Sequence, residues 1–516
     1  MKKRLKLLGV LGLALFGLML LLGNISYPLL WNDEAETAVY AQRILRFGYP
    51  KVFDGKNILY LFEHPNKDLA VKEGMGAYIG SGWTQYYLAT IGEFFAGKIS
   101  DIYVKTALLR LPFALIGLLG VVMMGLAIDW LFNDKLQFWL VFLLFTVSSV
   151  PLILHLREVR YYSLLLFFMA GVLYSYIRHH FGNKMSYLKY CWCLAGCLSL
   201  VFYTFFPAYI ILAGTIVLYE LFGEKKIKSL LPIIISGLLV LPGMIFFETS
   251  RISIEISSFL EFGWFDYFYH IFQMMKSALV YEFLLVVLFI KVILFKKGLD
   301  RGIKGRAADF LGLLTVIYVL LIARTPYMFE RYFIVLQPVL VLILILEGAG
   351  LFELKKKDLK RALVMVLLLG LPVLGIKVTA LRNRLYEVGN RYLGPLDVVI
   401  PYIRANYDRP GDLLIATNYE EAVYMYYLDS RMIVGYIEND LESDLSLQPD
   451  VIVPRRKWKR NLEALDKLRQ RGDYKQVLFS VFDSITNSIP ETSSHLYKTR
   501  LTKDKAEMSR IYIRRD

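Results

Sequence analysis

The sequence has few of the residues that build metal centres and disulfide frameworks. It contains only 3 Cys and 6 His among 516 residues. Cys191, Cys193 and Cys197 fall within one apolar block, so they are predicted to be buried thiols rather than an outer-face disulfide framework. No set of His, Cys and carboxylates has the spacing of a metal site, and no Gly-x-Ser-x-Gly motif is present. These patterns therefore predict no particular cofactor, and they leave a divalent metal open without identifying a site for it.

Charge is also scarce over long stretches. The chain is 56% hydrophobic, and many blocks of about 18–22 residues carry almost no charge, which is the length that crosses a bilayer. We therefore predict an α-helical polytopic membrane protein with about eleven transmembrane helices. The predicted spans are 5–23, 107–128, 136–154, 161–178, 190–206, 208–222, 229–247, 279–295, 308–323, 332–347 and 361–379.

The net charge of +15 follows this pattern. Lys and Arg residues concentrate in alternate short loops, which indicates membrane topology first and gives no reason to expect nucleic acid as a partner. The bias predicts a cytoplasmic N-terminus in a plasma (inner) membrane, and an odd number of spans then predicts an extracytoplasmic C-terminus. The run after Met1 resembles a signal peptide, but its length and the absence of a small-x-small site favour an uncleaved first helix.

Three predicted outer segments are long. They are the first outer loop, 24–106, an aromatic segment, 248–278, and the tail, 380–516. In the tail, strands are predicted at 412–416, 432–437, 450–453 and 476–482, and helices at 419–428 and 458–471. This alternation predicts a C-terminal extracytoplasmic α/β domain. The predicted domains are therefore 1–379, a transmembrane domain that includes loop 24–106 with amphipathic helices, and 380–516.

Acidic residues gather where the first outer loop begins. Asn32 or Asp33 is predicted to cap a helix that runs to about Phe47, and its packed face is expected to consist of Ala35, Ala38, Val39, Gln42 and Leu45. Acidic residues in a first helical turn are favourable against the helix dipole, which is one interpretation of Asp33 and Glu34. At the membrane surface, however, a carboxylate is also placed to act as a base on a substrate anchored in the lipid.

Arginines in other predicted outer turns are the basic partners expected for these carboxylates. Arg157 and Arg160 lie three residues apart in a very short outer loop, and Arg331 lies in another outer turn. Snorkelling to lipid headgroups is the simpler interpretation of each arginine taken singly. Several arginines on the less basic side favour phosphate binding, because guanidinium groups bind phosphate oxygens bidentately.

Four short elements in this order resemble the GT-C class of membrane glycosyltransferases. The branch that is most similar contains protein O-mannosyltransferases and the lipid A aminoarabinose transferase (glycosyltransferase family 39-like). The resemblance covers roughly the first 380 residues in architecture. Its elements are Trp31-x-Asp33-Glu34-Ala35, Trp83–Leu88 with Phe94-Phe95-x-Gly97, Arg110–Gly117, and Glu330-Arg331-Tyr332 before Pro338.

The resemblance implies a GT-C fold and a function. Members of this class use a polyprenyl-phosphate sugar as donor and invert the anomeric carbon, and some use a divalent ion. It implies that Asp33 is the general base, that Glu34 orients the acceptor or supports Asp33, and that Arg157, Arg160 and Arg331 bind the donor phosphate. Further candidates for substrate binding are His64, Lys72 and Tyr332. The stretch 57–82 lacks a Lys-Pro-Pro-like element that many relatives have, which leaves the acceptor open as a glycan, a lipid or a protein.

Two other functions fit the same pattern. A transporter or flippase of a lipid-linked saccharide would also bind a polyprenyl phosphate, but it would carry discontinuous helices and polar groups near mid-membrane. A non-catalytic assembly protein with a partner-binding outer domain would tolerate replacement of Asp33. The few central charges in the predicted spans favour the enzyme.

Overall fold

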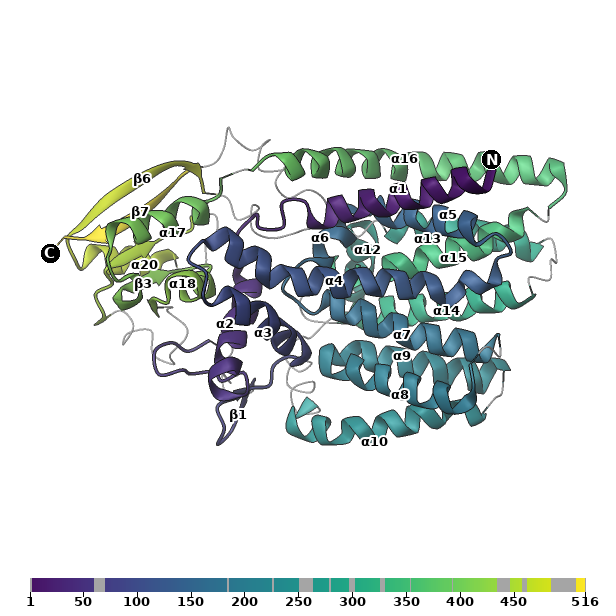
Figure 1. The fold of residues 1–516 in the computed structure, drawn as a ribbon, viewed down its shortest axis with the longest axis horizontal. Coiled ribbons are helices and arrows are strands. Elements are labelled where there is room, and N and C mark those ends of the chain that lie inside the picture. Colours follow the sequence, from purple (N-terminus) through teal and green to yellow (C-terminus); the bar gives the residue numbers. More distant parts are fainter. Residues whose placement is uncertain are drawn as a thin grey trace. The chain divides into compact units, whose positions relative to one another are not determined.

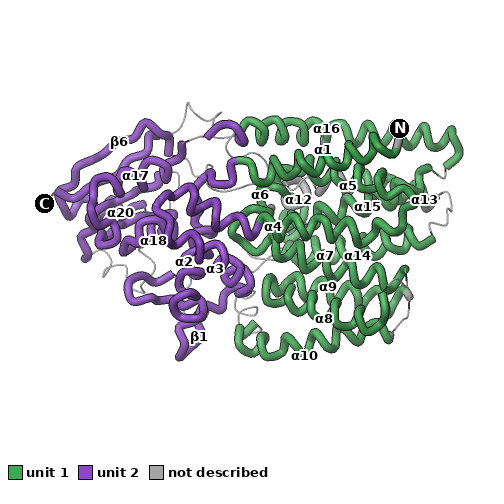
Figure 2. Tube along the Cα trace, in the orientation of Figure 1, with its two compact units in different colours: residues 1–23, 114–386, 491–493 green, residues 24–113, 387–490, 494–516 purple. Residues whose placement is uncertain are grey.

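The structure is a computed structural model of the whole chain. It describes residues 2–59, 70–182, 185–224, 227–249, 263–277, 280–296, 302–324, 330–352, 354–391, 393–433, 446–456, 462–483 and 507–515. Within these residues the chain forms two compact units, which are coloured separately in Figure 2. Unit 1 comprises mainly residues 1–23 and 114–386, and unit 2 comprises mainly residues 24–113 and 387–490 with the C-terminal strand. The predicted division of the chain at residue 380 stays a prediction.

Unit 1 is helical throughout its described length. Its apolar blocks have become helices because a backbone surrounded by hydrocarbon has to satisfy its hydrogen bonds within each segment. The helices are α1 (Lys2–Leu22), most of α4 (Ile102–Ile128), α5 (Lys135–Val147), α6 (Val150–Leu156), α7 (Tyr162–His180), α8 (Tyr187–Thr204), α9 (Phe206–Leu218), α10 (Leu231–Phe246), α12 (Trp264–Ser277), α13 (Val280–Lys296), α14 (Gly302–Ile322), α15 (Leu336–Leu351) and most of α16 (Lys356–Gly389).

Among the described residues, five helices are long and apolar enough to cross a membrane. Two further pairs, α5 with α6 and the two halves of α16, qualify together but bend by 81° and 42°, which makes up to seven candidate spans. A multi-pass membrane protein is therefore confirmed. Each predicted span overlaps a helix or, at 136–154, the bent pair of α5 and α6, and the number of eleven crossings stays a prediction.

The helices of unit 1 pack in neighbouring pairs, of which α8 with α7, α9 and α10 is the clearest group (Figure 1). Cys191 on α8 is buried in this packing and Cys197 is half-buried, but Cys193 is exposed. The expectation that all three thiols are buried was wrong for Cys193, because a helix with neighbours on several sides still turns one face outward. All three cysteines are free.

The aromatic segment predicted after the seventh span is described only in part. Its described part is α12, whose residues Trp264, Phe265 and Phe268 are more than half exposed. Exposed aromatic rings of this kind are typical of a helix that lies at a membrane interface.

Unit 2 begins with two helices of segment 24–106, which was predicted to be an outer loop. They are α2 (Asn32–Phe47) and α3 (Thr84–Ala96), which pack on each other, and a hairpin of β1 (Val71–Lys72) and β2 (Ala77–Tyr78) lies between them in sequence. Ala35, Ala38 and Val39 are buried as predicted. Leu45 is 51% exposed and Ile44 is buried instead. The predicted packed face was out of register by one residue at the C-terminal end of the helix, because buried positions recur every 3.6 residues.

The C-terminal part of unit 2 is a five-stranded mixed sheet with the order β4-β3-β5-β7-β6. Its strands are β3 (Leu414–Thr417), β4 (Arg431–Ile433), β5 (Val451–Val453), β6 (Tyr474–Phe482) and β7 (Met508–Arg514), with β3 parallel to β4 and β5, and β7 antiparallel to β5 and β6. The helices are α17 (Pro395–Asn406), α18 (Glu421–Leu428) and α20 (Leu462–Gln470). The predicted α/β character is confirmed, and the described residues include a strand, β7, and a helix, α17, that were not predicted.

The core of this sheet joins strands that are distant in sequence. Ala416, Ile433 and Ile452 of the three parallel strands pack with Leu465 and Leu468 of α20. Alternating apolar positions on strands meet the apolar stripe of a helix here, as is usual where a helix covers a sheet.

Candidate active site

The first turn of α2 carries the two predicted catalytic carboxylates. Trp31 is the N-cap residue, with extended backbone angles, and the Glu34 carboxylate accepts a hydrogen bond from the Trp31 N–H at 3.4 Å. The expectation that Asn32 or Asp33 caps the helix was therefore wrong by one or two residues. The helix starts earlier because Glu34, three residues after the cap, takes the first backbone N–H.

Glu34 is held by an arginine from the start of α4. Arg110 Nε donates to Glu34 Oε1 at 2.9 Å and Arg110 Nη2 donates to Oε2 at 2.5 Å. Glu34 is fully buried, and Arg110 is 3% exposed. Arg110 Nη1 also donates to the carbonyl oxygens of Ile25 and Pro28. This bidentate pair fixes the segment between α1 and α2, so that Glu34 has a supporting position rather than one that faces solvent.

Asp33 differs from its neighbour. It is half-buried rather than buried, and its backbone carbonyl accepts a hydrogen bond from the Thr37 hydroxyl at 3.0 Å. Asp33 therefore sits on a rigid first helical turn with its side chain partly accessible. A general base needs both properties, because it has to reach a proton on the substrate in a fixed geometry.

The turn between α6 and α7 carries Arg157 and Arg160 in unit 1. His155 Nδ1 lies 2.6 Å from Glu158 Oε2, and both residues are buried. Arg157 Nη1 donates to the carbonyl oxygen of Gly23, just after α1, at 3.1 Å. The turn is therefore built from polar contacts within itself and to the end of α1.

Arg331 lies in the 3-10 turn η5 (Glu330–Phe333), also in unit 1. Arg160 and Arg331 both interact electrostatically with Tyr161 and Tyr162. The ring of Phe205 stacks on Tyr161 at 5.0 Å between centroids and on Tyr332 at 6.0 Å. The structure thus brings two of the three predicted phosphate-binding arginines to one aromatic cluster.

The remaining predicted residues are placed as follows. Lys72 lies half-buried in β1 of the hairpin with β2, where its carbonyl oxygen accepts hydrogen bonds from the N–H groups of Met75 and Gly76. His64 lies outside the described residues. Within the part of the chain that the structure describes, no group of three or more His, Cys, Asp or Glu residues is arranged to hold a metal ion.

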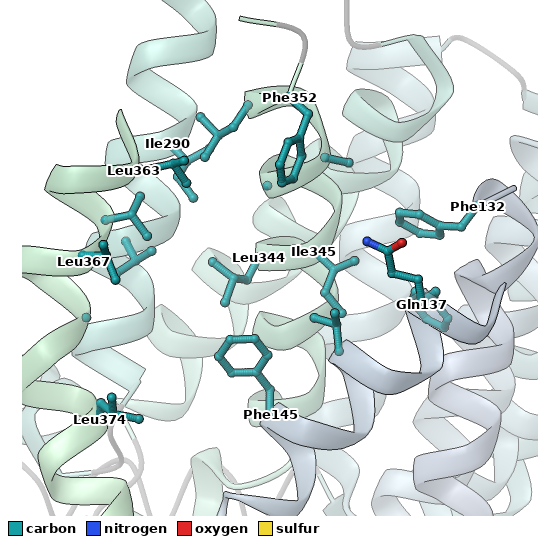
Figure 3. Close-up of a pocket in the computed structure, with 18 of the residues that line it drawn as sticks. Phe132, Gln137, Phe145, Ile290, Leu344, Ile345, Phe352, Leu363, Leu367 and Leu374 are labelled. Carbon is teal, nitrogen blue, oxygen red and sulfur yellow. The ribbon is translucent and has the colours of Figure 1, made fainter. Parts of the chain in front are cut away.

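An apolar cavity of about 710 Å³ opens within unit 1 (Figure 3). Its walls come from α5, α13, α15 and α16, and include Phe145, Ile290, Leu344 and Leu367. Asp134 and Gln137 at one end of α5 and Lys377 on α16 are among its few polar lining residues. Such a cavity suits a hydrocarbon chain better than a sugar.

Sequence patterns missed two residues around these sites, Arg384 and Glu421. Arg384 on α16 is 1% exposed and donates to the carbonyl oxygens of Leu20 and Gly23, which closes the C-terminal end of α1. Asn32 and Glu421 are hydrogen-bonded to each other beside Asp33. No local motif marks Glu421, because it enters the neighbourhood of Asp33 only through the tertiary packing of α18 on α2.

Comparison with known proteins identifies the fold of this chain through solved structures. No protein-family model matches the sequence, and no curated protein does. Two solved structures of ArnT from Cupriavidus metallidurans match almost the whole chain. The apo structure has a TM-score of 0.60 at 13% identity and covers 99% of this chain and 98% of ArnT. The structure bound to undecaprenyl phosphate has a TM-score of 0.55 at 14% identity and covers 98% and 97%. The resemblance to the aminoarabinose transferase branch of the GT-C class is therefore confirmed at the level of the fold, and the chain has the fold of ArnT.

Proposed function

We propose that this protein is an inverting glycosyltransferase that moves a sugar from a polyprenyl-phosphate carrier to an acceptor hydroxyl. The observation that carries the proposal is the contrast between two adjacent carboxylates on α2. Glu34 is buried and paired with Arg110, whereas Asp33 is partly accessible on the same rigid turn. The ArnT fold, and the undecaprenyl phosphate bound in one ArnT structure, support a polyprenyl phosphate as the donor class.

The proposed reaction is a single displacement. Asp33 takes the proton of the acceptor hydroxyl, the hydroxyl oxygen forms a bond to the anomeric carbon, and the bond from that carbon to the phosphate oxygen breaks. The polyprenyl phosphate leaves with the bonding electrons, and the anomeric configuration inverts. Phosphate is a stable leaving group, so no strong general acid is needed, and Arg157, Arg160 and Arg331 are proposed to stabilise its negative charge.

The cavity in unit 1 supports a lipid ligand. Most of its lining side chains are apolar. A polyprenyl chain bound in the cavity would bury this apolar surface, which is favourable. We propose that part of the donor chain occupies this cavity, while the sugar acceptor, whether glycan, lipid or protein, reacts at Asp33.

The proposal is tested by sugar transfer with the purified full-length protein. A panel of polyprenyl-phosphate sugars is offered together with candidate acceptors, and the product is analysed for anomeric configuration. We expect at least one donor to be consumed with inversion. Retention of configuration would contradict a single displacement with Asp33 as base, because one in-line displacement inverts the anomeric carbon.

The proposed location is the plasma membrane, with the N-terminus in the cytoplasm and the C-terminal sheet outside. The concentration of Lys and Arg in alternate loops supports this orientation. An alkaline phosphatase fused to residue 516 should be active, since this enzyme folds only outside the cytoplasm. An inactive fusion in a stable protein would reverse the orientation.

A transporter or flippase of a lipid-linked saccharide is the second candidate. The observation that favours it is the 81° bend between α5 and α6, since broken helices are typical of transporters. Proteoliposomes separate the two functions. Movement of a fluorescent polyprenyl-phosphate sugar between leaflets without any sugar transfer would favour the transporter.

A further inference from the structure

Helix α18 of the C-terminal sheet region is tied directly to the turn that carries Asp33. Asn32 Nδ2 donates to Glu421 Oε1 at 3.4 Å, and Asn32 Oδ1 accepts from the N–H of Ala422 at 3.3 Å. The N–H of Leu30 donates to the Tyr427 hydroxyl at 3.2 Å, further along the same helix. Residues on both sides of Trp31 are thus anchored to α18, and all of them belong to unit 2.

Glu421 is a buried carboxyl group in this contact. It is 1% exposed. Its pKa is raised to about 7, mainly by burial and to a smaller extent by the charge of Asp33, whereas a backbone hydrogen bond and the hydrogen bond from Asn32 lower it. Burial acts in this direction because it disfavours the charged form of an acid. Asp33 is therefore close enough for its charge to act on Glu421.

Two other carboxylates near α18, Glu34 and Glu420, already form ion pairs. Glu34 on α2 is paired with Arg110, as described above. Glu420, the residue before α18, forms an ion pair with Arg455, whose Nε also donates to Asp483 at 2.8 Å.

On the remaining packed elements, two carboxyl groups have hydrogen-bond partners and one arginine is exposed. Glu93 on α3 accepts hydrogen bonds from Tyr426 and Gln42. Asp397 on α17 accepts from Tyr103, and Arg431 on β4 is exposed. Among the described residues, Asp33 is the side-chain charge that acts on the protonation of Glu421.

We propose that Glu421 is a positioning residue for Asp33, which holds the turn through Asn32 most firmly when Glu421 is ionised. This inference rests on the proposed function. It assigns to the C-terminal region a part in catalysis, through a side chain that does not itself touch the substrate.

The pH dependence follows from reciprocity. If the hydrogen bond from Asn32 favours the ionised form of Glu421, ionised Glu421 binds Asn32 more tightly by the same free energy. A turn that is held more firmly keeps Asp33 in the fixed geometry that a general base needs. Turnover should therefore rise as the pH passes through about 7, where Glu421 ionises.

The test compares three full-length proteins over a range of pH. Glu421→Gln keeps the size of the side chain and an oxygen that can accept from Asn32, but removes the charge. Glu93→Gln is the matched control, because it is the same substitution at another buried carboxyl group whose pKa is raised by burial. Both kcat and the donor KM are measured for each protein.

We expect the rise of kcat near pH 7 to be present in the wild type and in Glu93→Gln and absent in Glu421→Gln. Above that pH, kcat of Glu421→Gln should be about 3- to 10-fold lower, a modest part of the range of general base catalysis, with an unchanged donor KM. Equal kcat profiles in the wild type and Glu421→Gln would overturn the inference, as would an equal loss in both variants. A wild type without any transfer would overturn the proposed function and this inference together.

A second variant covers the case in which Glu421→Gln does not fold. Asn32→Ala leaves α18 unchanged and removes the hydrogen bond that lowers the pKa of Glu421. The rise of kcat near pH 7 should then be lost, because Glu421 no longer acts on the turn through Asn32. A rise that stays at the wild-type pH would contradict the link between Asn32, Glu421 and Asp33.

Discussion

Arg110 and Glu34 form a buried bidentate ion pair between the start of α4 and the first turn of α2, with N–O distances of 2.9 and 2.5 Å. Arg110→Ala should leave the Glu34 charge buried without this partner. Breaking such a pair typically costs about 3–5 kcal/mol. The expected result is a clear fall in the Tm of the purified protein in detergent.

A double variant distinguishes pairing from packing. Glu34→Leu combined with Arg110→Leu removes both charges, and replacing a whole buried pair by apolar side chains is often neutral. The double variant should regain part of the stability that Arg110→Ala loses, although the contacts of Arg110 with Ile25 and Pro28 are gone. A double variant less stable than Arg110→Ala would contradict this account of the pair.

Arg160 and Arg331 are predicted to bind the donor phosphate. Replacing either by Lys keeps the charge but loses the planar fork that binds two phosphate oxygens at once. We expect the donor KM to rise about tenfold, equivalent to about 1.4 kcal/mol, with a stable fold.

Arg178→Lys is the control for these arginine variants. Arg178 lies near the other end of α7 and donates to Leu126 and Asp129. Its donor KM should equal that of the wild type. The phosphate assignment fails if Arg160→Lys and Arg331→Lys behave like this control.

The cavity in unit 1 is testable with glycines. A Cβ atom built on Gly348 of α15 meets nothing within 4 Å, and Gly348 lines the cavity. Gly348→Leu should therefore fill space without a clash and exclude part of the donor chain. The KM for a long polyprenyl donor should rise, and the KM for a short-chain analogue should not.

Gly375 on α16 provides a matched control. It has the same open surroundings but does not line the cavity. Both substitutions favour the helix by up to about 1 kcal/mol. An equal effect of Gly348→Leu and Gly375→Leu on the long donor would remove the cavity from donor binding.

Asp397 links stability to pH. Burial raises the pKa of this carboxyl group to about 6, above its ordinary value near 3.9. The folded state therefore holds the proton more tightly than the unfolded state, so the free energy of unfolding should fall as the pH rises from about 4 to about 6. The loss is at most about 3 kcal/mol.

Asp397→Asn should remove this pH dependence. Asn still accepts the hydrogen bond that the Gly394 N–H donates to Asp397 Oδ2 at 2.8 Å. The check is Tm against pH for the wild type, Asp397→Asn and the exposed control Asp408→Asn. Equal slopes for wild type and Asp397→Asn between pH 4 and 6 would contradict the assignment.

The transmembrane part of the fold was predictable because its signal is local. A block of apolar residues long enough to cross a bilayer forms a helix whatever its neighbours are. The strands β3 and β5 were found for a similar reason, as short apolar runs. β7 was missed because Arg510 and Arg514 interrupt its apolar residues, and α17 was missed because it carries Pro395 and Pro401.

The candidate site was predictable only for residues whose position along the chain determines where they lie. Asp33 and Glu34 follow the first span directly, so their position was accessible from sequence. The different roles of Asp33 and Glu34 were not predictable, because they depend on the contact of Glu34 with Arg110 on another helix, α4. Glu421 gave no signal at all, since its burial beside Asn32 is created by the packing of α18 on α2.

The central claim is that Asp33 is the general base, and one comparison tests it most directly. Sugar transfer and donor binding are measured for the wild type, Asp33→Asn and Glu36→Gln, a carboxylate on the same helix with no proposed role. The account predicts a loss of about 10²- to 10⁴-fold in kcat for Asp33→Asn, with donor binding retained and Glu36→Gln close to the wild type. Equal kcat for the wild type and Asp33→Asn would contradict it.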